Sequence, residues 1–290
     1  MGEVVTSLAH WRERIGALRS QGQRIGLVMT MGALHAGHAS LLERAARECD
    51  VAAATIFVNP RQFNDPGDLA AYPSDLAADL AVCDAAGVSL VLAPDVAEVW
   101  PSTPEPTSTT VHVAGLAEVL EGADRPGHFD GVASVVAKLA IVTGDCVAYF
   151  GEKDFQQLCV VRRVVEDLGL PLDVVGCETV REPDGLAMSS RNARLSAAGR
   201  VAAPVLLRGL LAGRDALERG ADVAGAEGAV RAAIAAERRV DLAYAAVVEP
   251  STLRAPAACA PGVSLRILVA ARIDGVRLID NLPATCGAAR

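Results

Sequence analysis

The 290-residue sequence has few aromatic residues, no paired-cysteine motif, no uninterrupted apolar run of membrane-spanning length and no excess of basic residues. Aromatic residues make up 3% of the chain, so Ala, Val, Leu and Ile must build its core. A helix that crosses a bilayer needs about 18 or more consecutive apolar residues. The apolar stretch at residues 132–142 is interrupted by Lys138, so we expect no membrane contact.

Acidic residues outnumber basic ones by 35 to 27, which gives a formal net charge of −8. Nucleic-acid-binding proteins usually present a basic face, so we expect no nucleic-acid partner. The seven cysteines are scattered and include no Cys-x-x-Cys pair. The first residues carry Glu3 and no apolar segment, so no secretory signal is expected. We therefore expect a cytoplasmic protein whose cysteines are small buried side chains rather than a disulfide framework.

Short apolar runs alternate with helical patterns over the first 180 residues or so. The apolar runs at 24–30 and 51–58 predict strands and residues 39–50 predict the helix between them, which together form a βαβ unit. Such alternation is typical of an α/β fold with a parallel sheet. Further strands are expected at 88–93, 146–150 and 172–175, and further helices at 74–86 (with Ser74 as N-cap and Gly87 as stop), 132–142 and 154–168.

The pattern changes after residue 180. Two Ala-rich helices are expected at 196–219 and 222–238, followed by strands at 242–248 and 265–271. Asp274-Gly275 between two apolar runs predicts a hairpin. We place a domain boundary near Thr179, with a small α+β unit after it and the most loop-like stretch of the chain at 101–106.

The segment from Met29 to His38 (MTMGALHAGH) joins the first strand to the helix that follows it. Ligands of doubly wound sheets bind at the carboxyl ends of the strands. Gly32 and Gly37 allow close backbone approach, and the helix N-terminus offers free N–H groups and a positive dipole end. His35 and His38, three residues apart, would point the same way, so a phosphate is the expected ligand. The alternatives are a plain capping loop and a zinc site, for which no cysteine or acid stands at ligand spacing nearby.

Two further segments carry polar residues at turns. Residues 57–64 (FVNPRQFN) follow the second strand, and the amides of Asn59 and Gln62 could read a hydroxy-acid through hydrogen bonds. The alternative is an ordinary Asn-Pro turn. Residues 125–132 (RPGHFDGV) place an Arg and a His in a Gly/Pro loop before a helix, which by itself is a weak signal.

Two more segments supply positive charge. Residues 150–158 (FGEKDFQQL) follow a strand, and they offer Lys153, a mobile charge suited to phosphate, and Gln157 one turn later. Residues 180–192 (VREPDGLAMSSRN) lie at the domain junction and offer hydroxyls and the bidentate fork of Arg191. Such a loop can close over phosphates, and the alternative is a polar linker.

These five segments together closely resemble the pantothenate synthetase (pantoate–β-alanine ligase) family. The His-x-Gly-His pattern alone marks only the wider nucleotidyltransferase superfamily, but five runs in the family's order and spacing are specific. The resemblance is looser over residues 195–290. The matching runs are TMGALHAGH (30–38), IFVNPRQF (56–63), RPGHFDGV (125–132), FGEKDFQQL (150–158) and VREPDGLAMSSRN (180–192).

The resemblance implies a Rossmann-like doubly wound parallel sheet over residues 1–179, which binds ATP and pantoate, and a smaller α+β C-terminal lid domain over 180–290. It also implies an AMP-forming carbon–nitrogen ligase. Pantoate, β-alanine and ATP, with Mg²⁺, would give pantothenate, AMP and pyrophosphate through a pantoyl adenylate. The family is usually homodimeric, so a homodimer is expected.

Residue roles are implied by the resemblance as well. His35 and His38 would stabilise charge that builds on the α-phosphate, with His38 as the proton donor, and Lys153 and Arg191 would complete the catalytic set. Pantoate or β-alanine would be held by Asn59, Gln62 and Gln157. The implied ATP-binding residues are Met31, Gly32, Ala33, Leu34, His35, Ala36, Gly37, His38, Gly151, Glu152, Lys153, Asp154, Val180, Met188, Ser189, Ser190 and Arg191.

Four positions depart from the family's usual residues. Met29 replaces Pro, Ala36 replaces Glu, Phe155 replaces Tyr and Ser74 replaces Arg. None of these changes removes a named catalytic group. Asp79 is the candidate protein ligand for Mg²⁺, although this ion often rests mainly on substrate phosphates and water.

Two other functions are weighed against the ligase. A different nucleotidyltransferase with the same His-x-Gly-His pattern, acting on another small acceptor, would need extra Arg or Lys for a phosphorylated acceptor, whereas Gln62 and Gln157 suit a small hydroxy-acid. A regulatory module without catalysis is disfavoured because His38 and Lys153 are both present.

Overall fold

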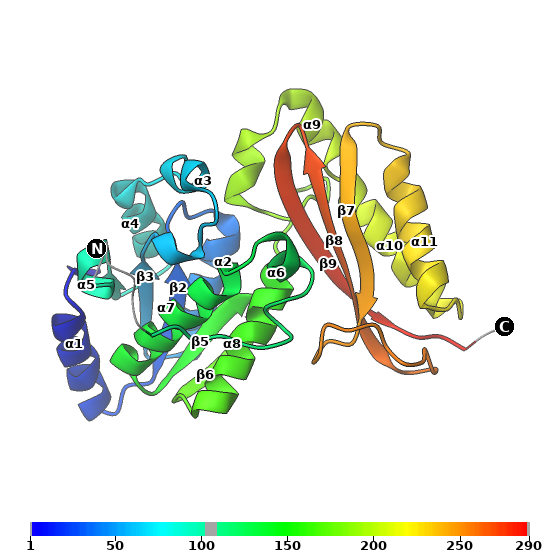
Figure 1. Ribbon diagram of the computed structural model, residues 1–290. Coiled ribbons are helices and arrows are strands. Elements are labelled where there is room, and N and C mark those ends of the chain that lie inside the picture. The colour runs from blue at the N-terminus through cyan, green and yellow to red at the C-terminus, as the bar shows by residue number, and fades with distance from the viewer. Residues whose placement is uncertain (1, 102–108, 289–290) are drawn as a thin grey trace. The chain divides into compact units, whose positions relative to one another are not determined.

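The computed structural model describes residues 2–101 and 109–288, and the chain forms two compact units (Figure 1). Unit 1 comprises Met1–Glu152 and Gln156–Glu178, and unit 2 comprises Lys153–Phe155 and Thr179–Arg290. Apart from Pro101, the loop expected at 101–106 lies outside the described residues. None of the described helices is both long and apolar enough to cross a membrane.

Unit 1 is built on a six-stranded parallel sheet, as the alternating apolar runs predicted. Its inner strands are apolar at nearly every position because helices cover both faces. The spatial order is β1 (Glu3–Val5), β4 (Leu90–Leu92), β3 (Val51–Ile56), β2 (Ile25–Thr30), β5 (Cys146–Gly151) and β6 (Leu172–Cys177).

Two cores lie on the two faces of this sheet, because successive side chains of a strand point to opposite faces. Leu27 packs in one core with residues of α1 (Leu8–Ser20), α7 (His128–Thr143) and α8 (Phe155–Leu168). Val28, the next residue, packs in the other with residues of α2 (Ala36–Glu48) and α4 (Leu76–Ala85). The short helices of this part of the chain are η1 (Pro60–Gln62), α3 (Pro66–Ala70), α5 (Val96–Val99), α6 (Glu121–Asp124) and η2 (Glu152–Asp154).

The order of the strands locates the ligand-binding edge. From β2 the chain builds outward through β3 and β4, and it then returns to place β5 and β6 on the other side of β2. The switch point therefore lies between β2 and β5. Open α/β sheets bind ligands at the carboxyl ends of the strands at such a point.

Unit 2 is a three-stranded antiparallel sheet of β7 (Val240–Val248), β8 (Ser264–Ile273) and β9 (Val276–Thr285), with α10 (Val205–Glu218) and α11 (Val223–Ala235) packed on it. Before these helices come η3 (Ser190–Arg194) and α9 (Ala197–Ala202). The expected hairpin is present, with Asp274 and Gly275 at φ 50° and 81° between β8 and β9. Positive φ at both central residues is the type I′ requirement, which Asp-Gly satisfies. The fold class expected for the chain is thus confirmed.

Several helix boundaries differ from the expected ones for local reasons. The helix expected from residue 74 begins at Leu76, because the Asp75 side chain rather than Ser74 caps it by accepting from Ala78 N at 3.0 Å. The helix expected over 196–219 is divided into α9 and α10 around Pro204, which has no N–H to continue the first helix. The helix expected from residue 39 begins at Ala36. Neither β1 nor α1 was expected.

The expectation of unpaired cysteines is wrong at two positions. Cys259 and Cys286 form a disulfide, with the two Cα atoms 5.7 Å apart. Of the other five cysteines, four are buried and Cys49 is half-buried. The paired residues stand 27 positions apart in sequence, and only the antiparallel arrangement of unit 2 brings them together. No local pattern marks such a pair.

Candidate active site

The loop between β2 and α2 is wound tightly enough to need positive φ at two successive residues. Gly32 has φ 82° and Ala33 has φ 52°, an uncommon conformation for a residue with a Cβ atom. The hydroxyl of Thr30 ties this loop to the sheet, because it accepts from Gly32 N at 3.2 Å and donates to Thr55 O at 2.8 Å. The loop therefore leaves the sheet in a defined direction.

Asp79 on α4 holds the same loop from the other side. Its two carboxylate oxygens accept from Ala33 N at 3.1 Å and from Leu34 N at 2.7 Å, and the residue is only 4% exposed. A Cβ atom on Gly32 would lie 2.7 Å from Asp79 Oδ2, so glycine is the residue that fits. Burial raises the pKa of the neighbouring Cys83 thiol to about 11, and the negative charge of Asp79 adds to this shift. Asp79 thus anchors the left-handed turn through charge-assisted hydrogen bonds.

The two histidines of the loop form the cap of α2. His35 is the N-cap residue, and its Nδ1 accepts from Gly37 N at 3.1 Å. His38 Nδ1 accepts in turn from His35 N at 3.3 Å, and the two ring centroids lie 4.1 Å apart. A ring nitrogen that accepts an N–H carries no proton, so each neutral imidazole has its proton on Nε2. The cap therefore makes both histidines Nε2–H donors at a helix N-terminus, which suits a bound phosphate.

The turn after β3 is organised around the side chain of Asn59, which is 1% exposed. Its Nδ2 donates to Gln62 Oε1 at 3.0 Å and to Gly131 O at 3.1 Å, while its Oδ1 accepts from Trp100 Nε1 at 3.1 Å and from Arg61 N at 3.3 Å. These four bonds use the full capacity of an amide. In this arrangement Asn59 orients Gln62 and has no capacity left for a substrate. Oε1 of Gln62 accepts from Asn59, which turns its Nε2 outward from this bond as the end that can donate to a ligand.

Residues at and just before the start of α7 contact the backbone of the same turn. Gln62 O accepts from Arg125 Nη2 at 3.3 Å and lies 2.7 Å from His128 Nδ1. A Cβ atom on Gly131 would lie 2.3 Å from Arg61 O and 2.7 Å from Gln62 N, so the close approach requires glycine. The Arg, His and second Gly of RPGHFDGV are therefore positioning residues for the Gln62 turn.

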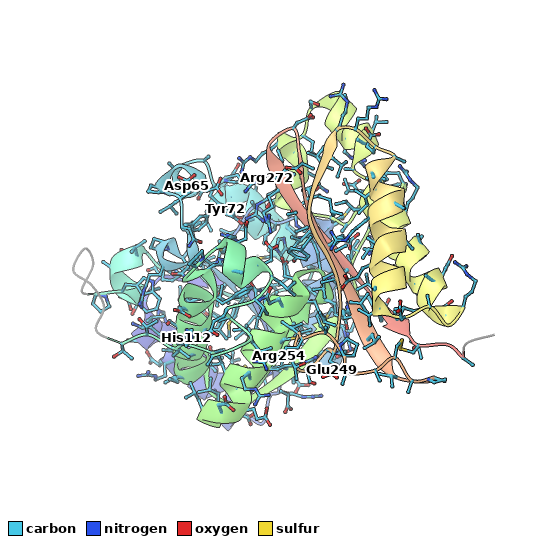
Figure 2. All side chains as sticks on the ribbon, turned by 45° about the vertical axis from the view of Figure 1, so that its right-hand side comes forward. Asp65, Tyr72, His112, Glu249, Arg254 and Arg272 are labelled. Atoms are coloured by element: carbon cyan, nitrogen blue, oxygen red, sulfur yellow. A yellow bond between two sulfur atoms is a disulfide. The ribbon has the colours of Figure 1, made fainter. Side chains whose placement is uncertain are left out.

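Tyr72, which is labelled in Figure 2, contacts both loops that follow β2 and β3. Its hydroxyl lies 3.5 Å from Gly32 O, at the limit of a hydrogen bond, and its ring meets the Phe63 ring edge-on with centroids 5.6 Å apart. The carboxyl ends of the two strands are paired as well, since Phe57 N donates to Thr30 O at 3.0 Å. The structure thus brings the His35 loop and the Gln62 turn to one edge of the sheet.

The strand β5 ends at the same edge. A Cβ atom on Gly151 would meet nothing within 4 Å, so the backbone there borders open space. Of the two adjacent glutamines on α8, Gln156 is buried and its amide bonds to Glu121 N, Leu116 O and Val119 O. Gln157 is half-buried and makes no side-chain hydrogen bond to any residue that the structure describes. Its amide is therefore the one that a ligand can use.

Unit 2 contains the cationic residues expected to meet phosphates. Lys153 is 16% exposed at its side chain, and its Nζ lies 3.6 Å from Asp154 Oδ1. In the loop of residues 180–192, Met188 N donates to Val180 O at 2.9 Å, and Ser189 caps η3 by accepting from Arg191 N at 3.3 Å. Ser190 and Arg191 are half-buried.

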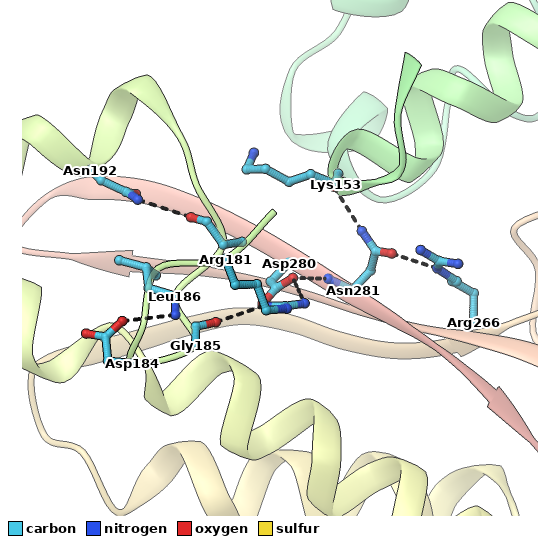
Figure 3. A network of polar contacts seen from close by, with 10 residues as sticks. Lys153, Arg181, Asp184, Gly185, Leu186, Asn192, Arg266, Asp280 and Asn281 are labelled. Carbon is cyan, nitrogen blue, oxygen red and sulfur yellow. Dashed lines mark hydrogen bonds and ion pairs between the residues drawn. The ribbon is translucent and has the colours of Figure 1, made fainter. Parts of the chain in front are cut away.

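Arg181 and Asp280 anchor this loop to the sheet of unit 2 (Figure 3). The guanidinium binds both carboxylate oxygens, at 2.7 and 2.9 Å, and Asp280 is 3% exposed. Arg181 also donates to Gly185 O at 3.0 Å, which closes the turn of the loop. Sequence reasoning assigned no role to either residue. Arg181 lies within the motif VREPDGLAMSSRN, whereas no local pattern distinguishes Asp280.

The predicted site residues thus fall into two groups, one in each unit. Unit 1 contains the β2–α2 loop, the Gln62 turn, Gly151, Glu152 and Gln157, while unit 2 contains Lys153, Asp154 and the loop of residues 180–191. Within unit 1, the histidines of the β2–α2 loop and the amides of Gln62 and Gln157 lie at the carboxyl edge of a doubly wound sheet. Such a fold and such a site are typical of nucleotide-binding α/β proteins.

Comparison with known proteins agrees with this class. Residues 3–283 match the family model described as pantoate-beta-alanine ligase. Curated relatives called pantothenate synthetase include one from Cereibacter sphaeroides, 49% identical over 98% of this chain and 100% of that protein. Another, from Nocardioides sp., is 48% identical over 97% of this chain and 86% of that protein.

Solved structures agree as well. The pantothenate synthetase from Thermus thermophilus is 47% identical, with a TM-score of 0.89 over 97% of this chain and 99% of that one. A pantoate-beta-alanine ligase from Francisella tularensis, complexed with beta-gamma ATP and beta-alanine, is 30% identical, with a TM-score of 0.78 over 97% of both chains.

The chain belongs to the pantoate–β-alanine ligase family. The family and the enzyme class expected from the sequence, a ligase, are therefore confirmed. So is the expected activity, which is the ligation of pantoate to β-alanine.

Proposed function

We propose that the chain joins pantoate to β-alanine in two steps on the residues described above. In the first, a pantoate carboxylate oxygen attacks the α-phosphorus of ATP, the bond from that phosphorus to the bridging oxygen breaks, and pyrophosphate leaves. In the second, the β-alanine amine attacks the acyl carbon of pantoyl adenylate, loses a proton and releases AMP. The observation that carries the proposal is the reciprocal cap of His35 and His38, which fixes two Nε2–H donors at a helix N-terminus.

The β2–α2 loop, Met31–His38, would bind ATP in the first step. Its helix N-terminus favours negative charge, and the two Nε2–H groups of His35 and His38 would donate to α-phosphate oxygens as charge builds there. His38 would be the proton donor of this step, in which pyrophosphate leaves. Because the donors are oriented before ATP arrives, little reorganisation is needed at the moment of reaction.

Pantoate would be held by amides rather than charges. The Nε2 group of Gln62 and the amide of Gln157 are the groups that can meet its oxygens. We assign Asn59 a positioning role through Gln62, because its four hydrogen bonds to the protein leave no direct contact for a substrate. The neutral amides bind a hydroxy-acid without neutralising the carboxylate that must attack.

The triphosphate would be contacted by residues of both units. Lys153 and Arg191 would neutralise its charge, with the hydroxyls of Ser189 and Ser190 as further donors. Backbone and side-chain contacts would come from Gly151, Glu152, Asp154, Val180 and Met188. We propose that unit 2 acts in this way as a lid on the ATP-binding and pantoate-binding unit 1.

Mg²⁺ would enter mainly with ATP. Among the described residues no group of three or more His, Cys, Asp or Glu side chains could hold a metal ion, so these residues by themselves offer no complete cage. This composition fits an ion bound by phosphate oxygens and water, where it would offset the charge of the triphosphate. Asp79, the candidate protein ligand, accepts one N–H at each oxygen, and the remaining lone pairs of its carboxylate would meet the ion or one of its waters.

We further propose that the protein is a homodimer in the cytoplasm. The proposal follows from its family, and sedimentation velocity at several concentrations tests the dimer. A single species at the mass of one chain throughout would contradict it.

The decisive assay measures AMP and pyrophosphate released from ATP and Mg²⁺ with pantoate, with and without β-alanine. We expect sustained AMP release only with both substrates, and formation of pantoyl adenylate with pyrophosphate when β-alanine is withheld. Turnover with a different acceptor but none with pantoate would contradict the proposal.

Two variants test the assigned roles. His38→Ala should lower the adenylation rate about 10²-fold or more, as removal of a transition-state donor does, whereas His112→Ala, a surface histidine, should leave it unchanged. A His38→Ala rate within threefold of wild type contradicts the role. Gln62→Ala should weaken pantoate far more than ATP, and equal weakening in titrations of the two ligands would exclude its acceptor role.

A further inference from the structure

Residues Lys153–Phe155 belong to unit 2, although the residues on both sides of them belong to unit 1. Two contacts attach this short segment to the C-terminal sheet. Asn281 Nδ2 donates to Lys153 O at 2.9 Å, and the Arg266 guanidinium lies over the Phe155 ring, 4.2 Å from its centroid. The two anchoring side chains are themselves joined, because Arg266 Nε donates to Asn281 Oδ1 at 2.6 Å (Figure 3).

The anchor is both buried and polar. Asn281 is 2% exposed and Arg266 is 7% exposed. Burying an amide or a guanidinium is unfavourable unless hydrogen bonds compensate for the water that is lost. Here both ends of the Asn281 side chain are bonded, one to Arg266 on β8 and one to the Lys153 backbone. Asn281 therefore fixes where the Lys153 main chain lies relative to the sheet of unit 2.

The residue before Asn281 performs the same task for the other cationic segment. Asp280 on β9 binds Arg181, which anchors the loop that carries Arg191. The two positions on β9 are also linked, since Asn281 N donates to Asp280 Oδ1 at 2.8 Å. Two consecutive residues of one strand thus hold both of the segments expected to meet the triphosphate.

We propose that Asn281 is a positioning residue for the adenylation step: it fixes Lys153 to β9, so that Lys153 and the loop of Arg191 present their charges to the triphosphate as one rigid set. The inference rests on the phosphate-binding role proposed above for Lys153. Asn281 touches no reacting atom, and it acts through the Lys153 carbonyl. It also places Lys153, which precedes the expected boundary near Thr179, in the lid.

Asn281→Asp is the sharpest substitution, because the aspartate keeps an oxygen for Arg266 and replaces the group that donates to Lys153 O with another acceptor. Asn281→Ala removes both contacts without adding charge. We expect each variant to raise the half-saturating ATP concentration or lower the adenylation rate at least tenfold, with half-saturation by pantoate within twofold of wild type. Ser251→Asp, an exposed site in unit 2, controls for the added charge.

A double-mutant cycle separates positioning from general damage to the fold. In a Lys153→Ala background, Asn281→Asp should change adenylation less than twofold, because the group through which it acts is gone. Its full effect in that background would overturn the proposal, as would wild-type ATP dependence in both Asn281 variants. Thermal melting of every variant identifies unfolding, and if Asn281→Ala does not fold, Asn281→Asp alone decides.

The same cycle distinguishes this inference from the proposal on which it rests. If Lys153→Ala adenylates at the wild-type rate, the phosphate role of Lys153 fails and the inference fails with it. If Lys153→Ala is impaired and Asn281→Asp is not, the role of Lys153 stands and only the inference is overturned.

Discussion

The carboxylate of Asp79 should control ATP binding through the shape of the β2–α2 loop. Two backbone N–H groups, of Ala33 and Leu34, are bonded to its two oxygens, and Ala33 is held at φ 52°. A left-handed conformation costs a residue with a Cβ atom about 1–2 kcal/mol, so the loop depends on these bonds. In Asp79→Asn the amide keeps one acceptor and sets an NH₂ group against the other N–H.

The magnitude follows from the lost bond. A hydrogen bond to a charged group contributes about 1.5–3 kcal/mol, and one of the two is lost outright. If that energy orders the loop for ATP, the dissociation constant for ATP should rise about 10- to 150-fold, since about 1.4 kcal/mol is tenfold. Isothermal titration calorimetry with a non-hydrolysable ATP analogue measures it.

Matched variants make the test specific. Asp75→Asn, at the N-cap of the same helix, should change little because Asn caps as well as Asp. Adding Ala33→Gly to Asp79→Asn should recover part of the affinity, because glycine removes about 1 kcal/mol of backbone cost. An Asp79→Asn affinity within twofold of wild type would refute the reasoning. So would recovery on raising Mg²⁺ alone, which would mark Asp79 as a ligand of the ion.

Three other outcomes are expected. Gly131→Ala should raise the half-saturating pantoate concentration and leave ATP binding unchanged, because a Cβ atom 2.3 Å from the Arg61 carbonyl oxygen must displace the turn that carries the Gln62 amide. Steady-state kinetics with each substrate varied measures this effect, and unchanged pantoate kinetics would count against it. The hydrogen bond to Asp130 raises the pKa of His112, so the stabilisation that this pair provides is present in full below about pH 6.5 and is lost as pH rises through the raised folded-state pKa. NMR titration of His112 should give a midpoint above 6.5 in the wild type and a lower one in Asp130→Asn, and an unchanged midpoint would exclude the contact. Reduction of Cys259–Cys286 should lower the free energy of unfolding by up to about 3.6 kcal/mol, the chain-entropy value for a loop of that size; urea unfolding with and without a reductant measures the change, and identical midpoints would show that the pair adds nothing.

Elements with strong local signals were predictable from sequence. The continuous apolar runs of β3 and β5 are typical of strands covered on both faces, and Asp274-Gly275 between two apolar runs is typical of a hairpin turn. The N-terminal β1 and α1 have no comparable signal, since β1 is three residues long and α1 has as many polar as apolar side chains. Pro204 divides one expected helix into two, because proline has no N–H to continue the first helix.

Much of the candidate site follows from motifs, because donors and amides come directly after strands whose carboxyl ends meet at one edge of a parallel sheet. The motifs do not show which of these side chains bond to the protein and which remain available to a ligand. Asn59 and Gln62 are both amides in one short turn, yet one is saturated by the protein and the other keeps an N–H for a ligand. Gln156 and Gln157 are neighbours, yet Gln156 is buried and bonded to the protein whereas Gln157 is half-buried. The period of the helix turns one amide into the core and leaves the other available.

What the sequence by itself determined is the family, the order of the elements and the identity of the reactive side chains, because each of these is written in runs of a few consecutive residues. Tertiary structure alone decided which groups hold those side chains in place. The contacts of Asp79 with the β2–α2 loop, of Gly131 with the turn of Asn59 and Gln62, of Asp280 with Arg181 and of Asn281 with Lys153 span separations of 45 to 128 residues. Contacts of this kind arise from packing, where distance in space is independent of distance along the chain. No local sequence pattern can therefore predict them.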